Sequence, residues 1–104
     1  MAADKAENRK QRRIKLKVPA TVKAGEHTLA ASTRDISVGG LFLITDSHFK
    51  PGSEIEVVLM LPKEVGLPFS EMVCCHAQIV RVEMSGGEYG VAAEIKRIAA
   101  LPQV

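Results

Sequence analysis

Aromatic residues are scarce in this chain. Its 104 residues include no Trp, one Tyr and three Phe. Proteins that bind single-stranded nucleic acid hold the bases largely by stacking them on exposed aromatic rings, and no predicted strand here carries two such rings. The formal net charge is only +2. A small β-barrel that binds RNA or DNA is therefore a minor alternative, which only the basic N-terminal segment supports.

Cysteine is scarce as well, and the two cysteines, Cys74 and Cys75, are adjacent. Neighbouring residues on a strand point to opposite faces, so we expect no disulfide between them. His27, His48 and His76 are scattered, and no C-x-x-C or other metal-ligand spacing is present. We interpret both cysteines as core and surface fillers of a reduced strand, and we predict no metal site.

Long apolar runs are also missing. No stretch approaches the roughly 20 apolar residues that span a bilayer. The N-terminus is followed by arginines instead of an apolar segment, unlike a secretory signal. These features predict a cytoplasmic protein without membrane insertion.

The groups that enzymes use are not gathered in the sequence. Ser37 has no nearby His or Lys that would activate it, and no paired carboxylates are evident. The sequence therefore predicts a binding module and not an enzyme.

Apolar and polar residues alternate along most of the chain, which is typical of half-buried β-strands. From Arg13 to Lys23 the apolar residues fall on every second position. Pro19 cannot donate to a ladder, so it predicts an edge position or a bulge. Further strands are expected near residues 27–35, 40–45, 54–61, 72–84 and 89–95. Six short strands with turns between them predict an all-β, antiparallel barrel or sandwich.

The strand expected at residues 72–84 changes phase. Its apolar residues first occupy odd positions, from Val73 to Ile79, and then even positions, at Val80 and Val82. Such a switch predicts a β-bulge. No long helix is expected, and the tail from Lys96 has room for at most one or two helical turns before Pro102.

Two segments stand out from this pattern. Residues 1–12 are polar and lead into the cluster Arg9-Lys10-Gln11-Arg12-Arg13, which we interpret as the basic end of a mobile arm. The second segment, Thr33 to Ile44, is a polar loop between two apolar flanks. In it Asp35 and Ser37 share one side of an extended backbone. Gly39 and Gly40 can take positive φ and allow close approach of a ligand.

Together the two segments resemble the PilZ domain family. Arg9-x-x-x-Arg13 matches that family's RxxxR motif, and Asp35-x-Ser37-x-x-Gly40 matches its [D/N]xSxxG motif. The resemblance extends from Asn8 to about Ile98. It implies a six-stranded antiparallel β-barrel over residues 14–98, a flexible basic arm over residues 1–13 and a tail over residues 99–104, where many PilZ domains continue into a helix.

The resemblance also implies a ligand, the bacterial second messenger cyclic di-GMP, and no cofactor. Arg9 and Arg13 would clamp bases and phosphates, Asp35 and Ser37 would read a guanine, and Gly40 would shape the loop. Arg12 and Gly39 are additional candidates. By contrast, Arg34 and Arg81 are interpreted as solvated strand arginines.

The chemistry of these residue types suits a cyclic guanine dinucleotide. The planar arginine fork donates two bonds to guanine O6 and N7 or to phosphate oxygens, and a carboxylate accepts from the guanine N1–H and amine. At about 1.5–3 kcal/mol per charge-assisted bond, four or five groups reach micromolar affinity after ordering costs.

We expect the arm to be disordered without ligand and to fold over the barrel on binding, which would signal to a downstream protein. The main alternative is a PilZ-like adaptor that acts through protein contacts and binds no nucleotide.

Overall fold

The computed structural model describes residues 13–61 and 72–101. Arg9 and Arg12 lie outside these residues. The described part contains seven β-strands and no helix, and within it no helix has the length and hydropathy needed to cross a membrane. The strands are β1 (Ile14–Lys15), β2 (Pro19–Ala24), β3 (His27–Ile36), β4 (Gly40–Thr45), β5 (Glu54–Met60), β6 (Met72–Ser85) and β7 (Glu88–Ala100).

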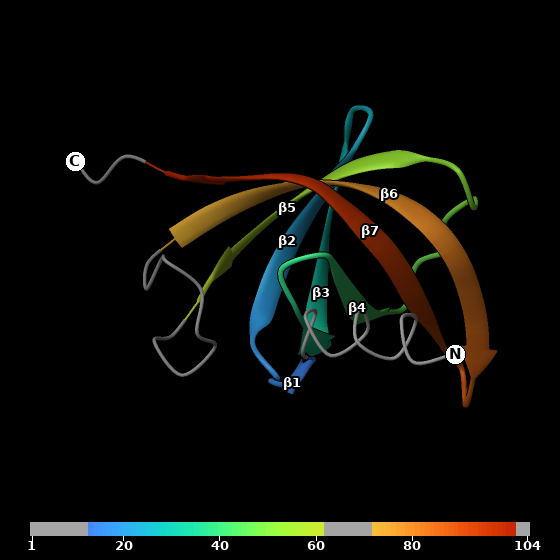
Figure 1. Cartoon of the computed structure of the whole chain (residues 1–104). Coiled ribbons are helices and arrows are strands. Elements are labelled where there is room, and N and C mark those ends of the chain that lie inside the picture. The colour runs from blue at the N-terminus through green and yellow to red at the C-terminus, as the bar shows by residue number, and fades with distance from the viewer. Residues whose placement is uncertain (1–12, 62–71, 102–104) are drawn as a thin grey trace, which may run out of the picture.

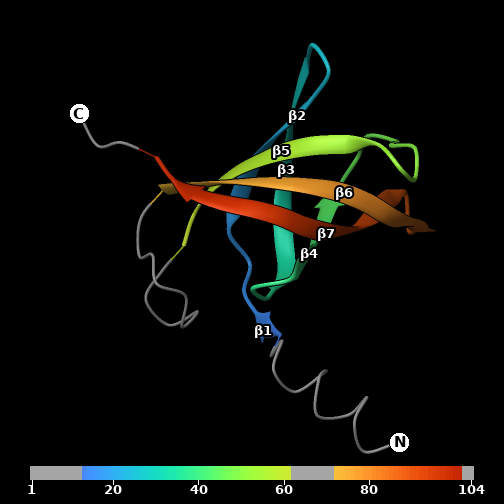
Figure 2. The ribbon, with the colours of Figure 1, turned by 45° about the horizontal axis from the view of Figure 1, so that its top comes forward.

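Six of these strands close into an antiparallel barrel (Figures 1 and 2). The order around the barrel is β3-β2-β5-β6-β7-β4, and an additional pairing of β3 with β4 completes the ring. The predicted all-β, six-stranded antiparallel barrel is therefore confirmed.

The predicted first strand is interrupted just before Pro19. β1 and β2 both pair with β3, and residues 16–18 between them belong to neither strand. The buried hydroxyl of Thr33 spans the gap, because it donates to the carbonyl of Leu16 and accepts from the N–H of Val18 at 3.0 Å. Burial still alternates from Arg13 to Lys23, so the predicted faces are correct although the ladder is broken.

The inward-facing residues of all six barrel strands form one apolar core. Its completely covered side chains include Val22, Leu43, Val57, Val73 and Val91. Residues that are paired across neighbouring antiparallel strands point to the same face of the sheet. The pairing register therefore also identifies which residues of each strand face outward. Phe42 is buried but does not belong to the core cluster, because it points outward.

Register shifts mark three bulges. Between Ile79 and Arg81 in β6, Val80 is an extra residue opposite β7, which is the bulge that the phase change predicts. A second shift inserts Lys96 into β7. The third lies in β3, where Arg34 is extra between Thr33 and Asp35. Each bulge exchanges the inward and outward positions of the residues that follow it.

The expectation of helical turns after Lys96 is wrong for residues 96–101. β7 continues to Ala100, which pairs with Val73 of β6, and Ile98 packs against the core. The long partner strand β6 offers ladder bonds and an apolar surface over this whole stretch. Ala99 and Ala100, assigned to the tail from sequence, are therefore strand residues.

The opposite faces of β5 give a direct test of this register. Leu59 points into the core and is fully buried, whereas Val58 lies on the outer face. We expect Leu59→Ala to lower the free energy of unfolding by about 2–5 kcal/mol because it leaves a cavity. Val58→Ala is expected to cost about 1 kcal/mol or less. Urea denaturation of both variants measures the difference, and equal losses would contradict the assigned faces.

Candidate ligand-binding site

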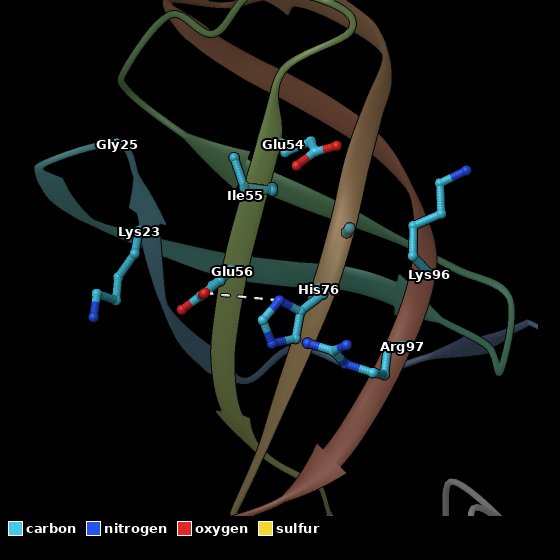
Figure 3. A pocket seen from close by; sticks show the side chains of 9 residues that line it. Lys23, Gly25, Glu54, Ile55, Glu56, His76, Lys96 and Arg97 are labelled. Carbon is cyan, nitrogen blue, oxygen red and sulfur yellow. Dashed lines mark ion pairs between the residues drawn. The ribbon is translucent and has the colours of Figure 1, made fainter.

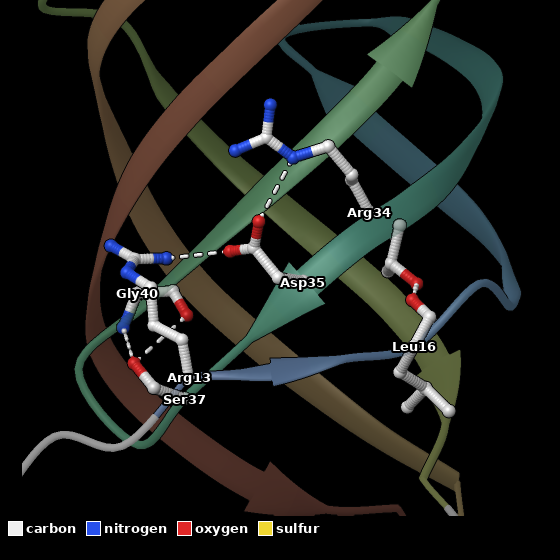
Figure 4. A network of polar contacts seen from close by, with 7 residues as sticks. Arg13, Leu16, Arg34, Asp35, Ser37 and Gly40 are labelled. Atoms are coloured by element: carbon white, nitrogen blue, oxygen red, sulfur yellow. Dashed lines mark hydrogen bonds and ion pairs between the residues drawn. The ribbon is translucent and has the colours of Figure 1, made fainter.

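Asp35 lies at the centre of a polar network on the outer face of the barrel (Figure 4). Its carboxylate Oδ1 lies 2.7 Å from Nη1 of Arg13, and its Oδ2 lies 2.9 Å from Nε of Arg34. Asp35 is buried, while the two arginine side chains are 58% and 57% exposed. Arginine carries five N–H groups, and these ion pairs use one from each guanidinium. Most of both guanidinium groups is therefore left to face a ligand.

The loop after β3 is closed by Ser37 and Gly40. The Ser37 hydroxyl donates to the Gly40 carbonyl at 3.3 Å and accepts from the Gly40 N–H at 3.2 Å, and the Ser37 N–H donates to the same carbonyl at 2.8 Å. Because Ser37 is buried and engaged in these bonds, its hydroxyl fixes the shape of the loop. The direct bond to a base or phosphate that the sequence resemblance implies for Ser37 stays a prediction.

Gly40 is required for close packing, as expected, but not for positive φ. A Cβ at this position would lie 3.2 Å from the Ala93 carbonyl oxygen and 3.4 Å from Nη2 of Arg13. The expected positive φ at Gly39 and Gly40 is wrong, because neither is among the left-handed glycines of the described residues. Gly40 instead begins β4 in an extended conformation, which the ladder with β7 imposes.

Phe42 forms an apolar floor beside Asp35. The two residues are paired across β3 and β4, so both point outward. The Cζ atom of Arg34 lies 3.7 Å from the centre of the Phe42 ring, within the range of a cation–π contact. The Arg34 side chain is 57% exposed, as expected of a solvated strand arginine, but its guanidinium is also held against this ring. The sequence signal for this contact was the uninterrupted apolar run from Leu41 to Ile44, since such a run requires cover on both faces of β4.

Gly90 makes room for this ring from the neighbouring strand β7. A Cβ on Gly90 would lie 2.5 Å from Cζ and 2.7 Å from Cε1 of Phe42. Phe42 therefore lies between the backbone of Gly90 and the guanidinium of Arg34. This packing explains why β7 carries a glycine inside a strand, where it is normally unfavourable.

A cavity of about 440 Å³ opens beside these residues. Its lining combines three arginines, Arg13, Arg34 and Arg81, and one carboxylate, Glu94, with the Gly39–Gly40 backbone and the apolar surface of Phe42. Asp35 is not part of the lining and lies behind its two arginine partners. The volume falls within the range of small-molecule sites. Arg81, interpreted from sequence as solvated, is bound to Glu83 at 2.8 Å but also borders this cavity. The arrangement suits an anion that carries flat rings.

A larger cavity of about 560 Å³ lies elsewhere, over the outer faces of β2, β5, β6 and β7 (Figure 3). Its lining mixes cations such as Lys23 and Arg97 with carboxylates such as Glu56, whose Oε2 lies 3.7 Å from Nδ1 of His76. None of the site residues predicted from sequence borders it. Three Lys and Arg side chains face two Glu side chains in its lining, whereas three arginines face one carboxylate in the smaller cavity. The smaller cavity also contains the predicted residues Arg13, Gly39 and Gly40, so we favour it.

The cysteines take the two positions expected of them. Cys75 is buried in the core, and burial, with a smaller effect from Cys74, raises the pKa of its thiol to about 12. Cys74 faces outward, 4.0 Å from Nε2 of His76, and burial followed by the charge of Glu56 raises its pKa as well. Neither is a thiolate at neutral pH. Over residues 13–61 and 72–101, no three His, Cys, Asp or Glu side chains are placed to hold a metal ion.

Comparison with known proteins identifies a family and a solved structure that this chain resembles. The PilZ domain family model matches residues 7–100. The solved structure of the Bacillus subtilis inhibitor of motility, MotI/DgrA, superimposes with a TM-score of 0.70 at 17% sequence identity. The match covers 85% of this chain and 42% of that protein, so the chain spans less than half of its length. No curated protein sequence matches.

The packing of Phe42 against Gly90 predicts the effect of adding one methyl group. We expect Gly90→Ala to destabilise the protein by about 1–3 kcal/mol. The new Cβ overlaps the Phe42 ring, and the guanidinium of Arg34 restricts the space into which the ring can move. In a Phe42→Leu background, which removes the overlapping ring atoms, the same change should cost less than half as much. Thermal denaturation of the four proteins completes the cycle. Equal costs in both backgrounds would contradict the contact.

Proposed function

Because the chain belongs to the PilZ domain family, we propose that it is a receptor for the bacterial second messenger cyclic di-GMP. The observation that carries the proposal is the contact between Arg13 and Asp35, 22 residues apart, at the edge of a cavity lined by three arginines. PilZ domains are regulatory binding domains. In this proposal the protein acts in the bacterial cytoplasm, as expected from the sequence.

The cavity lining is cationic enough to attract the phosphates of the ligand. Arg13, Arg34 and Arg81 outnumber the one carboxylate of the lining, Glu94, and guanidinium groups bind phosphate oxygens bidentately. The partly exposed side chains of these arginines can reorient toward the ligand without disturbing the core.

Asp35 is suited to reading a guanine. A carboxylate offers about four lone-pair sites, and the two ion pairs in the structure occupy one on each oxygen. The remaining sites can accept from the N1–H and the amine of a guanine. Phe42 and the Arg34 guanidinium stacked on it present flat surfaces beside this acceptor, and either surface complements a base.

The arm completes the proposed site. Arg9 and Arg12 lie outside the described residues, but Arg13 at the start of the described chain is anchored to Asp35. In this mechanism the residues before Arg13 close over the bound ligand and present a new surface to a downstream protein.

Isothermal titration calorimetry with cyclic di-GMP tests the assignment. We expect micromolar binding by the wild type and at least about tenfold weaker binding by Arg13→Ala, which corresponds to about 1.5 kcal/mol for a lost charge-assisted bond. Arg97→Ala is the matched control, because it removes an exposed arginine from the larger, separate cavity. It should bind within twofold of the wild type. Absence of binding heat in the wild type would favour the adaptor function.

The closing of the arm has a separate test. We expect the backbone amides of residues 5–13 to become less mobile on the nanosecond timescale when cyclic di-GMP is added, as measured by {¹H}-¹⁵N nuclear Overhauser effects. Amides of Val57 and Leu59 on β5 and of Val73 and Cys75 on β6 serve as the internal reference, because these paired residues belong to the core. Unchanged dynamics of residues 5–13 at saturating ligand would contradict the ordering mechanism while leaving binding intact.

A further inference from the structure

Strand β6 extends well beyond its neighbour β5. β5 pairs with β6 only as far as Gln78. The next residue, Ile79, exchanges backbone hydrogen bonds with the loop before β5, at 2.9 Å to Ser53 and 2.7 Å from Gly52. From there to Ser85, β6 is paired with β7 on one side, and no strand of the described chain pairs with its other side. Figure 1 shows this hairpin projecting past the start of β5.

An unpaired strand edge is a template for another strand, and proteins usually protect it with charge. The far end of β7, beyond its pairing with β4, carries Lys96 and Arg97. The β6 edge carries charged residues too, Arg81 and Glu83, but it also exposes apolar side chains. Met84 is 71% exposed and Val80 is 55% exposed, and they are two of the four large apolar side chains exposed in the described residues. The β6 edge therefore has the composition of a surface that binds a strand.

The charges on this edge specify which strand fits. Arg81 and Glu83 lie on the outer face and are both more than half exposed. If two copies of β6 pair antiparallel with Val82 at the two-fold axis, Arg81 of each copy lies directly opposite Glu83 of the other. On the other face, the two Val82 side chains meet and each Met84 lies diagonally against them. The edge is thus complementary to itself.

The neighbouring registers lack this complementarity. A shift of two residues, which keeps each side chain on its face, places either Glu83 opposite Glu83 or Arg81 opposite Arg81, so like charges face one another. The loop bound to Ile79 also blocks extension of the pairing beyond Val80. These constraints leave one favourable arrangement of about five residue pairs.

We propose that this protein self-associates into a symmetric dimer through antiparallel pairing of the β6 edges, centred on Val82. The contact joins the two barrels into one continuous sheet through the β6–β7 hairpins. It is short compared with the interfaces of stable complexes, so the dimer forms at protein concentrations of about 10–1,000 μM. The proposal does not depend on nucleotide binding.

Charge reversal tests the proposed register in the absence of nucleotide. Sedimentation velocity of the full chain over a range of concentrations measures the association constant. Arg81→Glu and Glu83→Arg each place like charges opposite one another in the homodimer, and each should weaken association by about tenfold or more. An equimolar mixture of these two variants restores both opposite-charge pairs, and so does the double variant. Both should associate within about threefold of the wild type.

Lys96→Glu is the matched control for Arg81→Glu, because it makes the same change of net charge at an exposed strand residue outside the β6 edge. It should associate like the wild type. Circular dichroism of each variant checks that the barrel is folded, and recovery in the mixture further excludes misfolding as the cause of a loss. A wild type that stays monomeric up to 1 mM would overturn the proposal. So would reversal variants that associate like the wild type, or a mixture that does not recover.

Discussion

The ion pairs of Asp35 on the outside of the barrel depend on one extra residue in β3. Thr33 points into the core, and strict alternation would direct Asp35 inward as well. Because Arg34 is bulged, Asp35 instead pairs with the outward-facing Phe42, and Ile36 takes the inward position. An unpaired carboxylate in the core would cost several kcal/mol. The bulge thus makes an acidic residue compatible with a buried strand, and it also provides the arginine that partly neutralises it.

The site is held by packing as much as by charge. Phe42 supports the Arg34 guanidinium, and Gly90 on β7 admits the Phe42 ring. The loop is closed by hydrogen bonds between Ser37 and Gly40, and the missing side chain of Gly40 lets Arg13 approach the loop backbone. The residues that position the polar groups from below, Phe42, Gly90, Ser37 and Gly40, are all buried. The barrel core fixes these neighbours in turn, since Leu41 and Leu43 on either side of Phe42 are fully buried.

Features encoded by local pattern could be predicted from sequence, and features set by cross-strand register could not. Alternation located every barrel strand, and the phase change at Val80 located the bulge in β6. The same kind of bulge at Lys96 disrupted the alternation of β7 and suggested helical turns where the strand continues. The motif residues Arg13 and Asp35 were identified because the family pattern names them. The contact of Arg34 with Phe42 could not be predicted, because the two residues become neighbours only through the pairing of β3 with β4.

The cavity and the unpaired edge of β6 share a structural origin. The bulge at Val80 turns both Val80 and Arg81 toward the outer face, where they border the cavity. It lies next to the point at which the loop before β5 replaces β5 as the neighbour of β6. Arg81 therefore belongs to both features, as a cation in the wall of the cavity and as the partner of Glu83 on the edge. Val80 lines the cavity and is also exposed on the edge. A deletion that restores regular pairing at Val80 must therefore alter the cavity and the edge together.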